Sequence, residues 1–232
     1  MSAPIDVTKR DSGVLRISVR TAGIMLAFTL VFTALMAGTY RATAPMVAAS
    51  ALAEKLRLIG EVLPPTSYDN DLMADAITLP ARKSLGLDDD TRLWRARRNG
   101  TPAALVLEAA APDGYAGRIG LILAVGVDGK LIAVRVTSHK ETPGLGDYIN
   151  PRKDRNKARP WITQFNNLGF DSVPPEQWRV KKDGGRFDQM SGATISARAV
   201  ANASGRALAW AVAHRDKLFA LPANSRYEES KP

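Results

Sequence analysis

Asp188-Gln189-Met190-Ser191-Gly192-Ala193-Thr194-Ile195-Ser196-Ala197-Arg198 is the segment in which a run of small residues meets the start of a long helical pattern. Ser191 is a residue type that caps helices, and Gly192 and Ala193 let the backbone come close to a ligand. Thr194 is therefore predicted to lie in the first helical turn. There, unpaired backbone N–H groups and the helix dipole favour an anion such as a phosphate.

The predicted helix continues from Thr194 to about Phe219. Arg198 lies one turn after Thr194 and is placed to neutralise the same phosphate. A narrow face of small residues suits close packing of this helix against a sheet. That face consists of Ala199, Ala203, Ala207 and Ala211. Ser-Gly-Ala-Thr alone is also typical of a simple turn and helix cap, so its context has to decide.

A second loop, His139-Lys140-Glu141-Thr142-Pro143-Gly144-Leu145-Gly146, follows a predicted strand. Pro143-Gly144 fits the two central positions of a type II turn, because Pro fixes the first φ and Gly permits a positive second φ. His139 and Glu141 also form the His-x-Glu pair of zinc deaminases. The chain has no cysteine to complete such a site, so we predict no metal centre and structural roles for His139 and His214.

Three segments of alternating apolar and β-branched residues are predicted to be strands. They are residues 104–109, 117–127 and 130–138, and Asn99-Gly100 and Asp128-Gly129 are strong turn signals. The Asp-rich residues 69–90 are predicted to mix loop with short helical pieces. Trp161 and Trp178 are predicted to be core residues, with a contact to a bound ring as the alternative for both. The fold class is therefore α+β, an antiparallel sheet with packed helices.

The amino-acid composition limits the classes of function that the protein can have. The absence of cysteine excludes disulfides, thiolate nucleophiles and thiolate-held clusters. A net charge of +9 invites a nucleic-acid interpretation, but the basic clusters at residues 92–98 and 152–159 lack interleaved aromatic side chains. We therefore predict no nucleic-acid partner. Solvated loops, anionic lipid head groups or an acidic protein account for these clusters equally well.

Residues 21–40 carry no charge and have the length that spans about 30 Å of hydrocarbon as a helix. Arg20 and Arg41 bracket this run. A cleavable signal peptide with a processing site at Ala42-Thr43-Ala44 is the alternative, but Pro45 would disfavour cleavage and the apolar core is long. We favour an uncleaved, single-pass anchor of the inner membrane. Basic residues before it place the N-terminus in the cytoplasm and the remaining chain in the periplasm.

Residues 47–63 form an amphipathic helical pattern with Leu52, Leu56, Ile59 and Leu63 on one stripe, ended by Pro64-Pro65. This stripe is expected to dock on the body of the domain, or less simply on a neighbouring membrane subunit. The expected organisation is a cytoplasmic tail (1–20), a transmembrane anchor (21–41), an amphipathic linker helix (42–66), a ligand-binding domain (67–222) and a flexible tail (223–232).

The loop of residues 139–146 precedes the loop of residues 188–198 in the chain. In this chain order the two loops together resemble the signatures of the FMN-binding domain family. This family includes the G subunit of the Rnf electron-transport complex and the C subunit of the sodium-translocating NADH:quinone reductase. The first signature is Asp188 followed by Ser191-Gly192-Ala193-Thr194, with Gln189 where a small residue is common. The second is His-x-Glu-Thr-Pro-Gly-Leu-Gly. The short chain with its single anchor resembles the G subunit more closely, and the C subunit is the near alternative.

The resemblance implies that Thr194 carries FMN through a phosphoester, with Ser191, Gly192, Ala193 and Arg198 near the phosphate. It implies that the second loop contacts the flavin ring through Glu141, Thr142, Gly144, Leu145 and Gly146. A separate flavin transferase that uses FAD would attach the cofactor. The domain would then be a covalent FMN-binding domain that carries electrons among the membrane subunits of an ion-translocating complex, with no substrate of its own.

Two functions of other classes stay open at this point. The first is a flavin-free membrane scaffold, in which Ser-Gly-Ala-Thr merely caps a helix. The second is a hydrolase or transferase with Ser191 or Thr194 as nucleophile, although the sequence places no general base beside either hydroxyl. A flavin covalently bound at Thr194 distinguishes the electron carrier from both.

Overall fold

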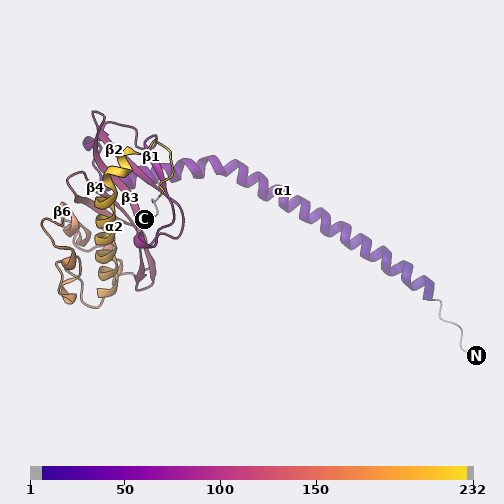
Figure 1. The fold of residues 1–232 in the computed structure, drawn as a ribbon. Coiled ribbons are helices and arrows are strands. Elements are labelled where there is room, and N and C mark those ends of the chain that lie inside the picture. Colours follow the sequence, from indigo (N-terminus) through magenta and orange to yellow (C-terminus); the bar gives the residue numbers. More distant parts are fainter. Residues whose placement is uncertain (1–6, 229–232) are drawn as a thin grey trace, which may run out of the picture. The chain divides into compact units, whose positions relative to one another are not determined.

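A six-stranded antiparallel sheet forms the centre of the computed structural model, which describes residues 7–228 and side chains from residue 14 onward (Figure 1). The strands lie side by side in chain order, so each pairs with the next. This arrangement confirms the predicted α+β class with an antiparallel sheet. The strands are β1 (Ala76–Leu79), β2 (Thr91–Arg98), β3 (Thr101–Gly114), β4 (Gly117–Gly126), β5 (Lys130–Ser138) and β6 (Leu168–Gly169).

Tight turns join the central strands, as their sequences predict. Asn99 and Gly100 both have positive φ, which is the requirement of the two-residue turn between β2 and β3. The predicted turn at Asp128-Gly129 is one residue longer than expected, because β4 ends at Gly126 and Val127 belongs to the loop. The Asp-rich residues 69–90 contain strand β1, which the sequence analysis missed because its four residues lie between loop-forming ones.

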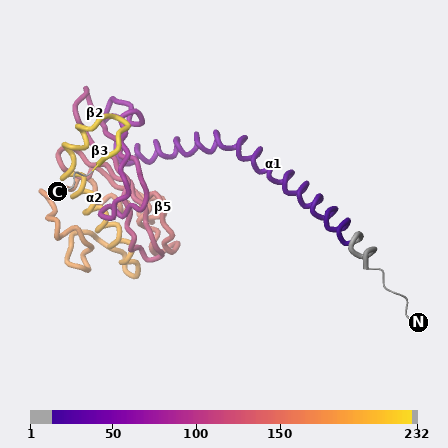
Figure 2. The backbone as a smooth tube through the Cα atoms, turned by 45° about the vertical axis from the view of Figure 1, so that its right-hand side comes forward, coloured from indigo at the N-terminus to yellow at the C-terminus, as the bar shows by residue number. Residues whose placement is uncertain are grey.

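The sheet is buried on both faces by different partners. Helix α2 (Thr194–Ala220) packs on one face, chiefly along β3, and its predicted small-residue face is buried (Figures 1 and 2). The other face carries a smaller apolar cluster that includes Ile59, Val62 and Leu63. Strand β3 contributes side chains to both apolar clusters, because successive side chains of a strand point to opposite faces of the sheet. Leu105 and Leu107 belong to the cluster on the α2 side, and Ala104 and Val106 belong to the cluster on the other side.

The N-terminal residues form one helix, α1 (Val7–Val62), which continues through Pro45. Two separate helices were expected there, because a proline inside a helix removes a backbone hydrogen bond. Within residues 14–62 the helix is long and apolar enough to cross a membrane. The chain divides into a unit ending at Glu54 and a compact unit starting at Lys55. Of the predicted stripe, Ile59 and Leu63 are buried in the compact unit, whereas Leu52 and Leu56 are exposed.

The basic cluster of residues 92–98 is divided between the interior and the surface, because Arg92 and Arg98 are exposed and Arg95 is buried. Arg95 is only 1% exposed, and its guanidinium donates to the carbonyl of Leu218 (3.0 Å) and pairs with Asp75. Arg97 pairs with the same carboxylate at 2.7 Å. The two arginines therefore satisfy carbonyls at the C-terminal end of α2, where cations are favoured by the helix dipole. This tertiary role replaces the surface roles considered for Arg95 and Arg97, whereas the roles considered for the exposed Arg92 and Arg98 stay predictions.

Residues 224–227 run along β1, although the tail is predicted to begin at residue 223. The backbone N–H of Asn224 donates to Ala76 at 2.7 Å, and that of Tyr227 donates to Thr78 at 2.9 Å. Tyr227 is buried against the α2 core. Residues 1–6 of the predicted cytoplasmic tail and 229–232 of the predicted C-terminal tail lie outside the described residues.

Candidate functional site

Thr194 is the first residue of α2, and the loop before it is a tight turn. The N–H of Ala193 donates to the carbonyl of Met190 at 3.1 Å. Gly192 is the third residue of this turn and has a φ of +83°, a conformation that glycine adopts readily. Ala193 is the N-cap residue and no side chain caps the helix. The prediction that Ser191 caps α2 is therefore wrong, because this turn places Ser191 two residues before the N-cap position.

The start of α2 has unused hydrogen-bonding capacity. Within residues 7–228, no group forms a hydrogen bond with the hydroxyl of Thr194. The first backbone N–H groups of an α-helix have no partner within the helix, and here no side chain supplies one. An anion at this end of a 27-residue helix would meet free donors and the positive end of the dipole.

The second predicted loop has the turn that its sequence indicates. The N–H of Leu145 donates to the carbonyl of Thr142 at 3.1 Å, and Gly144 has a φ of +74°. These features confirm the predicted type II turn. Thr142, Gly144 and Leu145 are exposed, whereas Gly146 is buried. The loop therefore presents one edge to solvent and packs its end against the domain.

Glu141 joins the two loops. Its carboxylate is 3% exposed and accepts hydrogen bonds from the hydroxyl of Ser196 and from the N–H of Ala116 (3.1 Å). Gly146 lies against the same pair, because a Cβ added to it would be 2.7 Å from the Ser196 oxygen. Ser196 was not among the predicted site residues, and only its position two residues after Thr194 hinted at a role.

A cavity of about 120 Å³ separates the loop after β5 from the start of α2. Its rim carries exposed apolar side chains, with Leu145 and Ile195 each 42% exposed and Tyr115 66% exposed. Ligand pockets commonly measure about 300–1,000 Å³, so a planar ring here would be only partly enclosed. Free amide donors, a free hydroxyl and an apolar rim fit a phosphorylated cofactor with a flat ring such as FMN.

Arg198 is engaged with an acidic residue in this structure. Its guanidinium contacts both carboxylate oxygens of Asp183, at 2.5 and 2.8 Å. This hydrogen bonding lowers the pKa of Asp183 and raises the pKa of Arg198. The predicted contact of Arg198 with a phosphate would therefore require the arginine to leave or share Asp183, and it stays a prediction.

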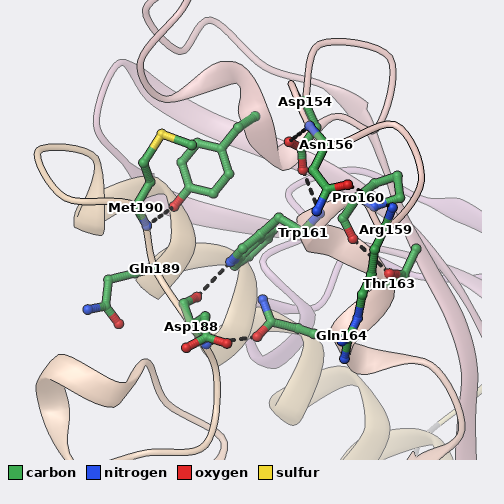
Figure 3. A pocket seen from close by; sticks show the side chains of 11 residues that line it. Asp154, Asn156, Arg159, Pro160, Trp161, Thr163, Gln164, Asp188, Gln189 and Met190 are labelled. Carbon is green, nitrogen blue, oxygen red and sulfur yellow. Dashed lines mark hydrogen bonds between the residues drawn. The ribbon is translucent and has the colours of Figure 1, made fainter.

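The two tryptophans between the loops differ in burial. Trp178 is buried with Phe165 and Phe187, which confirms its predicted core role. Trp161 is partly buried and borders a larger cavity of about 380 Å³ beside the segment 188–190 (Figure 3). The ring N–H of Trp161 donates to the carbonyl of Asp188 at 2.6 Å. Sequence reasoning did not foresee this contact, because the two residues are 27 positions apart.

Two family models match separate parts of the chain, and named relatives match most of it. The model of the FMN-binding domain matches residues 114–209, and that of the RnfG N-terminal region matches residues 13–62. A relative from Pseudomonas aeruginosa is 40% identical over 90% of this chain and 96% of its own length. A relative from Photorhabdus laumondii is 42% identical over 80% of this chain and 86% of its own length.

Both relatives are named as the G subunit of an ion-translocating oxidoreductase complex, as is one from Shewanella amazonensis with 38% identity. The match to the Shewanella relative covers 86% of this chain and 91% of the relative's own length. Both predicted loops fall within the matched FMN-binding domain. The chain therefore belongs to the family of G subunits of ion-translocating oxidoreductase complexes and contains an FMN-binding domain.

Proposed function

We propose that this protein is a membrane-anchored electron carrier of an Rnf-type complex, with FMN bound covalently to Thr194 through a phosphoester. The observation that carries the proposal is the position of Thr194. Its hydroxyl is free of hydrogen bonds within the described residues 7–228, at the uncapped start of α2. The similarity to G subunits over most of the chain supports the Rnf assignment over the related C subunit of a sodium-translocating NADH:quinone reductase.

The residues around Thr194 divide into a phosphate side and a ring side. The turn of Ser191, Gly192 and Ala193 lets the phosphate approach the backbone N–H groups of α2. The exposed Leu145 and Ile195 offer apolar surface to the ring. Thr142 and Gly146 line the other edge of the cavity, near the buried Glu141, and Gly144 lies between them in the same loop. When bound, FMN supplies one- and two-electron redox chemistry.

This chain contributes positioning and access to electron transfer. A cavity of about 120 Å³ can hold only part of the cofactor, so an edge would stay exposed for other subunits of the complex. Covalent attachment prevents loss of the cofactor by dilution. In this proposal the chain carries electrons and does not convert a substrate on its own.

Attachment requires a second enzyme, a flavin transferase that uses FAD. The Thr194 oxygen would form a bond to the FMN phosphorus, and the pyrophosphate bond of FAD would break with AMP as leaving group. The hydroxyl proton would pass to a base of the transferase. The phosphodiester that results keeps about one negative charge, which the helix terminus favours.

The proposed location is the inner membrane, with residues 1–20 cytoplasmic, 21–41 spanning the bilayer and 42–66 linking to the domain of residues 67–222 in the periplasm. A helix of suitable length and composition within Val14–Val62 supports an anchor. The excess of basic residues before the span supports the orientation. The other membrane subunits of the complex would be its partners.

Intact mass spectrometry of the full chain, produced with an active flavin transferase, tests the proposal. We expect an increase equal to FMN less one water, located on the peptide that contains Thr194. Thr194→Val should abolish the increase and keep the fold, whereas Thr137→Val, an exposed threonine of β5, should be modified like the wild type. An unmodified wild-type mass would overturn the covalent carrier and favour a flavin-free scaffold.

A further inference from the structure

The loop before Thr194 is held by side chains from another part of the chain. Two short 3-10 helices, Asp147–Ile149 and Trp161–Phe165, supply Tyr148, Trp161 and Gln164. Trp161 donates to the carbonyl of Asp188 at 2.6 Å, and Gln164 accepts from the N–H of Asp188 at 2.7 Å (Figure 3). Both backbone polar groups of Asp188 are thus fixed by side chains that come from outside the loop.

Tyr148 holds the last residues before the helix. Its hydroxyl accepts a hydrogen bond from the N–H of Met190 at 3.1 Å and donates to the carbonyl of Ala193 at 3.3 Å. These are the two end residues of the turn that contains Ser191 and Gly192. One buried hydroxyl therefore spans the turn that leads into Thr194.

The ring of Tyr148 is itself fixed. The side chain is 3% exposed and meets Trp161 edge to face, with ring centroids 5.4 Å apart. Burial raises the pKa of the Tyr148 hydroxyl, so the proton that it donates to Ala193 is retained at physiological pH. A rigid, packed phenol can hold a loop in place where a flexible side chain could not.

The loop needs such support because residues 188–193 belong to no helix or strand. Loop backbone without ladder hydrogen bonds samples many conformations, and only those that present Thr194 suitably would bind a transferase. When only a fraction of the acceptor is competent, its apparent affinity falls by that fraction.

We propose that Tyr148 is a positioning residue for cofactor attachment, which holds the Met190–Ala193 turn so that Thr194 is presented to the transferase before the two proteins meet. The inference rests on the proposed covalent attachment at Thr194. Tyr148 takes no part in bond making. Its contribution lies in the free acceptor protein, so its loss should raise the KM for the acceptor and leave kcat nearly unchanged.

The test measures attachment kinetics with the full-length chain in detergent, the cognate flavin transferase and excess FAD. The acceptor concentration is varied, and product is read as fluorescence in denaturing gels. For Tyr148→Phe, which keeps the packed ring but removes both hydrogen bonds, we expect a KM increase of about tenfold and kcat within about twofold.

Tyr68→Phe is the matched control, because Tyr68 packs against the opposite face of the sheet. Its hydroxyl makes no hydrogen bond with any residue in the described range 7–228. Trp161→Phe is a second variant, which removes the donor to Asp188 and should also raise KM. Exchange of the Met190 amide in the unmodified chain should speed up in Tyr148→Phe and stay unchanged in Tyr68→Phe.

The outcomes separate the inference from the function on which it rests. Attachment to the wild type with an unchanged KM in Tyr148→Phe would overturn the positioning role of Tyr148 and leave the proposed function intact, whatever the KM of Trp161→Phe. A fall in kcat with unchanged KM would also overturn it, since the effect would then lie in the bound complex. A wild-type chain that is never modified would remove the proposed function and this inference together.

Discussion

The hydroxyl of Ser196 donates a hydrogen bond to the buried carboxylate of Glu141, and this contact joins the first turn of α2 to the loop after β5. The residues are 55 positions apart. Both line the cavity beside Thr194, so the bond fixes the distance between the two loops that the proposed flavin would contact.

Ser196→Ala should therefore lower the free energy of unfolding by about 1–3 kcal/mol, since the buried Glu141 loses one of its two donors. Urea unfolding of the full chain in detergent, followed by tryptophan fluorescence, measures the change. Ser138→Ala, at the exposed end of β5, is the control and should lie within about 0.5 kcal/mol of the wild type. Equal effects of the two substitutions would contradict a structural bond at Ser196.

The pair of Asp183 and Arg198 should make stability depend on acid pH. Hydrogen bonding to Arg198 holds the pKa of Asp183 below its ordinary value of 3.8. A lowered carboxylate pKa stabilises the folded state above the unfolded pKa, and this contribution is lost as pH falls through the folded pKa. Asp183→Asn should thus have a lower melting temperature than the wild type at about pH 6. This difference in melting temperature should become smaller as the pH falls below 3.8, the ordinary pKa of the carboxyl group.

Melting curves between about pH 2.5 and about pH 7, a range that covers the titration of carboxylates, measure this dependence. Asp216→Asn is the comparison, because the Asp216 carboxylate is exposed and lies elsewhere on α2. A constant difference between wild type and Asp183→Asn over the whole range would contradict the assignment. The pair is exposed to solvent, so salt should weaken the effect.

Gly205→Ala should destabilise the protein although alanine is the better helix former. A methyl group at position 205 would lie 2.9 Å from the Cβ of the buried Trp178. Overpacking of this kind costs about 1–3 kcal/mol. Gly60→Ala in α1 has no atom within 4 Å of the added carbon and should be neutral or stabilising by up to about 1 kcal/mol. The melting temperature should therefore fall for Gly205→Ala and stay equal or rise for Gly60→Ala, and a higher melting temperature for Gly205→Ala would refute the close contact.

Arg95→Met should cost about 3 kcal/mol of unfolding free energy. The substitution removes the partner of Asp75 and leaves the carbonyl of Leu218 without its donor, while Arg97 still holds the carboxylate. Arg98→Met, in the same strand but exposed, should change stability by less than about 0.5 kcal/mol. Chemical denaturation that gives the same value for both would show that Arg95 is not a structural residue.

The proposed orientation can be tested with single cysteines, because the natural chain has none. Asp216 has a side chain that is 89% exposed in the domain. Asp216→Cys should react with a membrane-impermeant maleimide in spheroplasts, whereas Ser12→Cys, in the predicted cytoplasmic tail, should react only after the membrane is permeabilised. The opposite labelling pattern would reverse the orientation.

Local features of the fold could be predicted because short-range backbone geometry follows from residue type. Positive φ at Gly144 and Gly100 and the termination of α1 before Pro64 are of this kind. Strand β1 could not be predicted, since its four residues become a strand only by pairing with β2. The N-cap of α2 was misplaced because the Met190–Ala193 turn, rather than Ser191, determines where the helix begins.

The sequence by itself determined the two loops that border the candidate site, the apolar helix, the central strands and the small-residue face of α2, because each is a pattern of neighbouring residues. Only the tertiary structure decided that Ser196 bonds Glu141, that Tyr148 and Trp161 hold the loop before Thr194, and that Arg95 is buried at the end of α2. These contacts join residues 27 to 123 positions apart. Such pairs form only when the sheet and helix pack, so no local pattern encodes them.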